Sequence, residues 1–327
     1  MGCSNLPSDE KSLENESFKK YKNIATVEKL ESQQTVYIGI NFFMELNYDK
    51  FLVSNQDNKV AIYDKKTFKP IVIIDLDFWS ANYIIKLKSG NFLFGCDKGK
   101  LFHFSINEEE GTYKELNSFD LQFNITKMLE NNEEIIISDY KNIYFIDNKF
   151  NDNELNTRKV YEDHLPEIDI FNIFLVDNLL LSCAYGQNDV GLNEILIHDL
   201  ATNEIVFKRS KAEVMPWNQS VCKVNSNILA ITGNQPGILL LDIKSFQILA
   251  EIKDLDFFYC VICFRNKIFC GSNSGEIYEF EYRPEINEFK YLAKFKIHES
   301  SIFSITKTSF GELVTTSRDG TIKFFKL

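Results

Sequence analysis

The residues best able to do chemistry in this chain are its cysteines and histidines. The cysteines are Cys3, Cys96, Cys183, Cys222, Cys260, Cys263 and Cys270, and the histidines are His103, His164, His198 and His298. The cysteines are odd in number and irregularly spaced, which disfavours a disulfide framework. Cys260 and Cys263 form a C-x-x-C pair, but the surrounding FFYCVICF predicts a strand, in which residues at this spacing point to opposite faces. We therefore expect no shared metal, and buried, inert thiols at the internal positions.

The sequence lacks the motifs of the common catalytic sites. It contains no G-x-x-x-x-G-K phosphate loop, no G-x-S-x-G nucleophile elbow and no H-E-x-x-H zinc motif. The histidines are far apart along the chain. The sequence therefore predicts no catalytic residue, metal or cofactor.

The N-terminal residues resemble a lipidation signal. Met1-Gly2-Cys3-Ser4 begins like a dual acylation motif, in which Gly2 carries myristate and Cys3 carries palmitate. The match is partial, because Leu6 stands where the motif has Ser or Thr. Two interpretations remain open, an acylated tail and an unmodified one. Residues 8–23 are mixed in charge and would add little attraction to an acidic membrane.

Several aromatic residues lie beside acidic residues in predicted loops. The pattern Asp-Leu-Asp followed by two aromatic residues occurs at 75–79 and again at 254–258, and a further loop holds Met215-Pro216-Trp217. Loop aromatics are either packing anchors or binding hot spots. As a hypothesis, the protein-binding residues are Phe78, Trp79, Trp217, Phe257 and Phe258. The acidic neighbours favour a basic or mixed-charge partner.

Seven copies of one strand-turn-strand pattern must position these residues. The pattern appears at 50–64, 91–104, 133–147, 178–199, 227–242, 267–281 and within 298–327. The spacing of about 44 residues is typical of a propeller blade built from four short strands. Turn residues such as Asn273-Ser274-Gly275 supply the backbone torsions of tight hairpins. The sequence therefore predicts an all-β fold, a seven-bladed β-propeller with four-stranded antiparallel blades.

The last copy has only three strands before Leu327. A ring needs the fourth strand, and the segment around 24–32 (IATVEKLES) is the natural donor, because pairing the two chain ends removes an open sheet edge. We therefore divide the chain into a flexible polar tail, residues 1–23, and a propeller domain, residues 24–327.

These repeats resemble those of WD-repeat β-propellers, although the Trp-Asp dipeptide survives only in altered forms such as Tyr63-Asp64. In that family a His, a Ser or Thr, an Asp and a Trp form a structural hydrogen-bond network. The resemblance implies that His298, Thr315 or Ser317, and Asp319 take these roles, with Phe325 in place of the Trp. It implies a structural His298 and a protein that serves as a binding platform.

Composition narrows the function further. The net charge of -11 and a pI near 5.0 disfavour nucleic-acid binding, which depends on clustered Lys and Arg. Residues 1–23 lack the apolar centre of a signal peptide, and no apolar run is long enough for a membrane helix. We expect a cytoplasmic, non-enzymatic scaffold or adaptor for other proteins or peptides, at a membrane only if the N-terminus is acylated. The alternatives are a propeller enzyme or small-ligand sensor that uses the central channel, and a lipid-anchored membrane adaptor.

Overall fold

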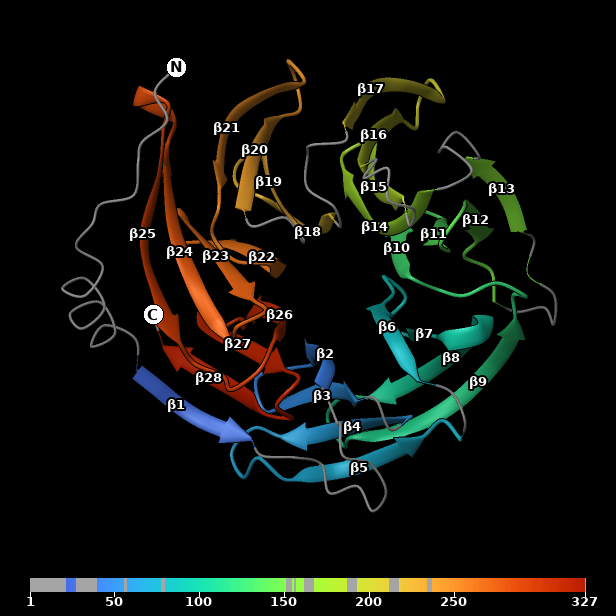
Figure 1. Ribbon diagram of the computed structural model, residues 1–327. Coiled ribbons are helices and arrows are strands. Elements are labelled where there is room, and N and C mark those ends of the chain that lie inside the picture. The colour runs from blue at the N-terminus through green and yellow to red at the C-terminus, as the bar shows by residue number, and fades with distance from the viewer. Residues whose placement is uncertain are drawn as a thin grey trace.

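The chain forms a ring of seven four-stranded antiparallel sheets (Figure 1). The computed structural model describes residues 22–27, 40–55, 58–77, 80–150, 155, 157–161, 168–186, 193–211, 218–233 and 237–326. Within these ranges the only helical elements are two single 3-10 turns, η2 (Asp97–Gly99) and η3 (Pro284–Ile286). The predicted all-β, seven-bladed propeller is confirmed.

The first four blades follow the chain in order, each with its innermost strand first. Blade 1 contains β2 (Ile40–Glu45), β3 (Lys50–Asn55), β4 (Lys59–Asp64) and β5 (Pro70–Asp75). Blade 2 contains β6 (Ala81–Lys86), β7 (Phe92–Cys96), β8 (Lys100–Asn107) and β9 (Thr112–Asp120). Blade 3 contains β10 (Lys127–Asn131), β11 (Glu134–Ser138), β12 (Ile143–Asp147) and β13 (Thr157–Tyr161). Blade 4 contains β14 (Ile168–Val176), β15 (Leu179–Gly186), β16 (Asn193–Asp199) and β17 (Glu204–Lys211).

The remaining blades complete the ring. Blade 5 contains β18 (Asn218–Lys223), β19 (Ile228–Gly233), β20 (Gly237–Asp242) and β21 (Gln247–Lys253). Blade 6 contains β22 (Phe258–Phe264), β23 (Lys267–Ser272), β24 (Glu276–Arg283) and β25 (Glu288–Lys296). Blade 7 contains β26 (Ile302–Lys307), β27 (Glu312–Ser317), β28 (Ile322–Lys326) and, as its outer strand, β1 (Lys22–Val27).

The two ends of the chain close the ring together. β1 pairs antiparallel with β28, in a register that places Lys22 opposite Lys326 and Val27 opposite Ile322. Closure by an N-terminal strand is therefore confirmed. The strand begins at Lys22 rather than Ile24, and residues 28–32 of the predicted donor segment lie outside the described residues.

The core consists of one apolar cluster between each pair of neighbouring blades. Middle strands such as β11, with Ile135, Ile136 and Ile137 all buried, contribute to the clusters on both sides of their blade. The near-continuous apolar runs of the sequence have this cause, because each blade is covered on both faces. The core therefore stabilises the ring as a whole.

Bulges repeat at two fixed positions of the blade. Near the start of the inner strand one residue has no partner on the next strand in blades 1, 2, 4, 5, 6 and 7; these residues are Asn41, Asn82, Phe171, Gln219, Tyr259 and Phe303. The outer strand skips one residue in every blade, and each skipped residue is aliphatic: Ile24, Ile71, Leu116, Val160, Val206, Leu249 and Leu292. A bulge bends its strand and redirects a side chain. The inner-strand bulges therefore matter for the site described next.

Candidate functional site

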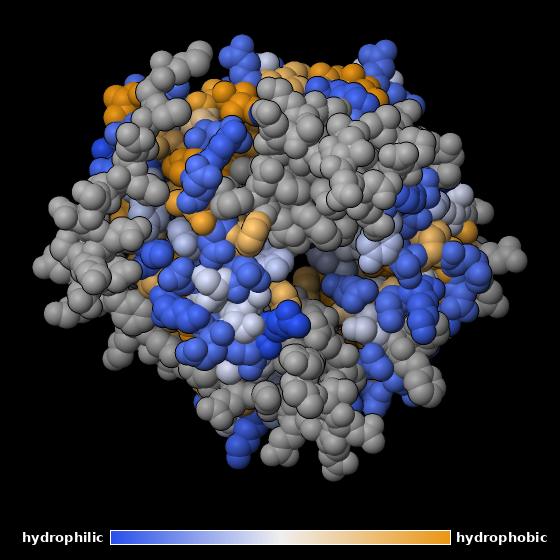
Figure 2. Space-filling model, viewed as in Figure 1, coloured by the Kyte–Doolittle hydropathy of each residue, from blue (hydrophilic) through white to orange (hydrophobic). Residues whose placement is uncertain are grey.

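An acidic and aromatic surface lies on the face of blade 6 that carries the turn between its second and third strands. We call this side of the ring the upper face. The connection that leads from blade 5 into blade 6 also lies on the upper face, because the Asn273 N–H donates to the Phe257 carbonyl at 2.8 Å. The upper acidic–aromatic surface consists of Asp256, Phe257, Tyr259, Glu276 and Phe303. This surface lies where blades 6 and 7 adjoin. Figure 2 shows the central opening of the ring, with hydrophilic side chains beside it.

Phe257 is the exposed apolar member of this surface. Its side chain is 42% exposed, and its backbone N–H donates to Asp256 Oδ1 at 2.7 Å. Together with the bond from Asn273 to its carbonyl, this contact holds the backbone of Phe257 at both ends. The ring is thus presented to solvent from a fixed backbone.

Two carboxylates of the surface lie within hydrogen-bond distance of the same serine hydroxyl. The Ser274 hydroxyl lies 2.5 Å from Asp256 Oδ2 and 3.0 Å from Glu276 Oε2, and the hydroxyl of Tyr278 donates to the same Glu276 oxygen at 3.3 Å. Burial, followed by the charges of Glu276 and Asp256, raises the pKa of Tyr278 above its usual value. Lys294 Nζ is 3.8 Å from Glu276, so the surface is acidic but partly compensated.

Asn273 joins this surface to blade 7. Its side-chain oxygen accepts hydrogen bonds from the Tyr259 hydroxyl at 3.1 Å and from the Ser301 hydroxyl at 2.9 Å. The bulged residues Tyr259 and Phe303 meet edge to face, with ring centroids 5.9 Å apart. The bulges therefore bring aromatic rings of two blades together, which sequence spacing alone does not reveal.

The structure separates the five aromatic residues proposed from the sequence. Phe258 is fully buried in the core between blades 5 and 6, where its ring lies 4.9 Å from Tyr278 and 6.2 Å from Phe280. The hypothesis that Phe258 is a binding contact is therefore corrected: it is a packing anchor, because the strand alternation turns it inward next to the outward-facing Phe257. Phe78, Trp79 and Trp217 lie outside the described residues.

His298 stands at the centre of a hydrogen-bond network in blade 7. Its Nδ1 is 2.9 Å from Asp319 Oδ2, and its Nε2 is 2.8 Å from the Thr315 hydroxyl. Burial lowers the pKa of His298, so the neutral ring donates from Nδ1 to Asp319 and accepts from Thr315 at Nε2. Burial acts to raise the pKa of Asp319, but the hydrogen bonds from His298 and Thr321 outweigh it and hold that pKa below its usual value.

Ser317 has a different role in the same blade. Its hydroxyl donates to the Ser300 carbonyl at 3.1 Å and accepts from the Asp319 N–H at 3.0 Å. Thr315 is thus the partner of the histidine, while Ser317 fixes the turn that holds Asp319. Phe325, at the position of the family's Trp, is buried in the core between blades 6 and 7.

The thiols of the C-x-x-C pair point to opposite faces of β22, as predicted. Cys260 Sγ is 3.5 Å from the Ile302 carbonyl in blade 7, whereas Cys263 Sγ is 3.7 Å from the Val224 carbonyl in blade 5. Burial raises the pKa of Cys260 to about 12. The six cysteines of the described ranges are free thiols, and no group of three or more His, Cys, Asp or Glu side chains in those ranges is arranged to hold a metal.

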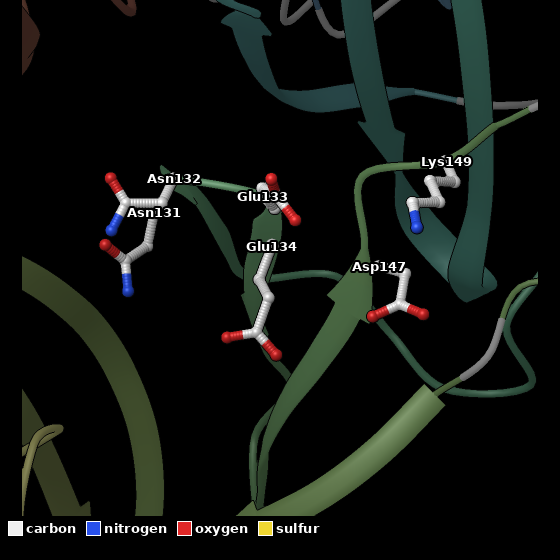
Figure 3. Close-up of a pocket in the computed structure, with 6 residues that line it drawn as sticks. All are labelled: Asn131, Asn132, Glu133, Glu134, Asp147 and Lys149. Carbon is white, nitrogen blue, oxygen red and sulfur yellow. The ribbon is translucent and has the colours of Figure 1, made fainter.

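A pocket of about 430 Å³ opens on blade 3, away from the upper face. Its lining residues are Asn131, Asn132, Glu133, Glu134, Asp147 and Lys149 (Figure 3). They belong to the turn between β10 and β11 and to the end of β12. The Arg158 guanidinium lies 3.1 Å from Glu134 and compensates part of the acidic lining. The pocket is therefore a surface hollow formed by turns of one blade.

The N-terminal positions Gly2 and Cys3 lie outside the described residues. No helix in the described part of the chain has the length and apolar character needed to span a bilayer.

Comparisons with known proteins rest on structure alone. No protein-family model matches the chain, and no curated protein matches its sequence. A chain in the crystal structure of the Mitotic Checkpoint Complex superposes with a TM-score of 0.73 at 13% identity, over 100% of this chain and 96% of that one. The WD40 β-propeller domain of Doa1 gives a TM-score of 0.66 at 13% identity, over 94% and 97% of the two chains.

The same architecture is also similar to BamB from Moraxella catarrhalis, with a TM-score of 0.61 at 13% identity over 85% of this chain and 82% of that one. At identities this low, the structural likeness establishes the fold and leaves the function open. The altered repeat motifs, the seven closed blades and the similarity to the Doa1 domain agree on one architecture. By its fold, the chain is a seven-bladed β-propeller, similar in architecture to the WD40 β-propeller domain of Doa1.

Proposed function

We propose that this protein is a non-enzymatic scaffold or adaptor that binds a segment of another protein on its upper acidic–aromatic surface. The observation that carries this proposal is Phe257, an aromatic side chain 42% exposed on a backbone held by hydrogen bonds at both ends. A preorganised aromatic ring loses little conformational entropy when it binds, and such rings are common hot spots.

The charges around Phe257 support a basic or mixed-charge partner. Asp254 is exposed and Asp256 lies directly beside the ring, while Lys294 and Lys296 flank the other side of Glu276 and Ser274. An apolar partner residue would pack on Phe257, and a neighbouring Lys or Arg would face Asp256. Because this attraction acts across solvent, we expect association to weaken as salt rises.

Protein partners also fit the architecture. A propeller of similar fold is part of the crystallised Mitotic Checkpoint Complex. The net charge of -11 makes nucleic acid an unfavourable ligand.

Substitution of the exposed ring tests this proposal. Affinity purification of the full chain from its native cell, followed by quantitative mass spectrometry, should recover partners that Phe257→Ala loses. The direct affinity for a recovered partner should fall by about 2 kcal/mol, roughly 30-fold, with the melting temperature unchanged. Tyr48→Ala is the matched control, because Tyr48 is an exposed aromatic residue in the turn between β2 and β3 of blade 1, outside this surface. Equal capture by the Phe257→Ala protein would rule out this surface.

We also propose that the protein works in the cytoplasm, and at a membrane only through acylation of Gly2 and Cys3. If acylation occurs, Gly2→Ala should move the protein from the membrane fraction to the soluble fraction, because one remaining chain anchors poorly. An unmodified N-terminal peptide in a wholly soluble wild-type protein would exclude the lipid-anchored form.

A further inference from the structure

A second aromatic surface lies on the lower face, where the inner strands of blades 6 and 7 end. Phe310, in the turn between β26 and β27, is 61% exposed. Phe264 and Arg265 adjoin the same turn: a Cβ at Gly311 would stand 3.6 Å from the Phe264 ring and 3.4 Å from Arg265 Nη2. We call Phe264, Arg265, Lys307 and Phe310 the lower basic–aromatic surface.

Two exposed cations lie over one ring of this surface. The Arg265 guanidinium carbon is 5.1 Å and Lys307 Nζ is 5.9 Å from the centroid of the Phe264 ring. Lys307 forms no ion pair with any described residue. The surface is therefore locally positive on a protein whose net charge is -11.

The positive region continues into blade 5. Lys223, the last residue of β18, is exposed, and its neighbour Val224 accepts a contact from Cys263 Sγ, next to Phe264, at 3.7 Å. Lys65 lies on the Phe310 side, with its Nζ 4.9 Å from the centroid of that ring. The charge of Lys65 is compensated, because its Nζ lies 2.7 Å from Glu312 and 3.7 Å from Glu45. The exposed cations of this surface thus lie on the Phe264 side.

The N-terminal strand begins at this face. In the blade 7 sheet Lys22 is opposite Lys326, which in turn is opposite Glu312, two residues after Phe310. Two strand spacings are about 10 Å. The chain that precedes Lys22 therefore enters β1 about 10 Å from the turn that carries Phe310.

The sequence just before β1 has the complementary chemistry. Residues 8–18 (SDEKSLENESF) contain four carboxylates, one lysine and the apolar residues Leu13 and Phe18. Phe18 is four residues from Lys22, which spans at most about 13 Å when extended. The segment can therefore reach the lower basic–aromatic surface without leaving its own molecule.

We propose that residues 8–18 of this chain bind the lower basic–aromatic surface in cis. Phe18 packs beside Phe310 or Phe264, and the carboxylates face Arg265, Lys307 and Lys223. The short covalent connection gives the segment an effective concentration in the millimolar range, so a contact that would be weak between molecules is occupied within one. Residues 8–18 lie outside the described residues, and the contact is independent of the upper surface.

Photo-crosslinking in the full chain tests this contact. With a benzophenone amino acid in place of Phe310, irradiation should link position 310 to the tryptic peptide 12–19 (SLENESFK), identified by mass spectrometry. The yield should not change on tenfold dilution, and it should fall several-fold between 0.1 M and 0.5 M salt. The same crosslinker in place of Phe257 should give no such product. The proposal fails if position 310 does not label this peptide, or if the yield falls with dilution, which would indicate a second copy.

A charge exchange gives the second readout. Arg265→Glu with Lys307→Glu should lower the crosslink yield about fivefold, the value of a roughly 1 kcal/mol charge interaction. Adding Glu14→Lys and Glu16→Lys should restore it, with the yield summed over all linked peptides within residues 12–19, because trypsin also cleaves after the new lysines. A yield that stays low after the exchange, in a protein with a wild-type circular dichroism spectrum, would overturn the pairing. A yield insensitive to Arg265→Glu and Lys307→Glu would overturn it as well.

Discussion

At the scale of the residue, His103 is a buried titratable side chain whose surroundings disfavour its charged form. Both ring nitrogens are buried without a hydrogen-bond partner, and the ring lies 4.9 Å from that of Phe150. Burial lowers the pKa of His103 below its ordinary value of 6.5. A lowered folded-state pKa means that the unfolded chain takes up the proton first, so stability falls as the pH drops through 6.5 and below. We expect His103→Leu to reduce the loss of melting temperature between pH 7.5 and pH 5.5 and to change stability at pH 7.5 by no more than about 1 kcal/mol. His298, whose pKa is also lowered, retains part of the pH dependence in this variant. An unchanged pH profile would assign the acid sensitivity to other groups.

At the scale of the element, the outer strand of blade 7 decides whether the ring is closed. β1 covers the edge of β28 with a ladder of backbone hydrogen bonds, each worth roughly 0.5 to 1.5 kcal/mol net. Deleting residues 1–27 should therefore cost several kcal/mol in the free energy of unfolding and expose an edge that favours aggregation. Deleting residues 1–20 leaves β1 intact and should change stability by less than about 1 kcal/mol, because it removes only a surface contact. Urea unfolding followed by circular dichroism measures both variants, and equal midpoints would contradict closure by this strand.

At the scale of the whole molecule, the seven inter-blade clusters make the ring one cooperative unit. Leu240 is fully buried between blades 5 and 6. We expect Leu240→Ala to cost about 2 to 5 kcal/mol through lost burial and the cavity it leaves. Because closure links every blade to two neighbours, the variant should still unfold in a single, shifted calorimetric transition. Ile205→Ala, at an exposed position of β17, is the matched control and should stay within about 0.5 kcal/mol of the wild type. A separate low-temperature transition in Leu240→Ala would show that blades 5 and 6 unfold on their own.

The sequence by itself determined the blade number, the all-β class and the closing strand. These properties follow from repeated local signals, namely strand alternation, turn residues and a missing fourth strand, and each can be read within one repeat. It also predicted the opposite facing of Cys260 and Cys263, because side-chain direction in a strand depends only on residue spacing. Only the tertiary structure decided which of two adjacent aromatics is exposed: Phe257 faces solvent and Phe258 is buried, although both follow the same acidic pattern. The sequence likewise did not predict the contact of Tyr259 with Phe303 or that of Phe264 with the Phe310 turn. These contacts join residues about 45 positions apart across two blades, and they depend on bulges and on how the blades pack around the ring. No pattern within a single repeat encodes them.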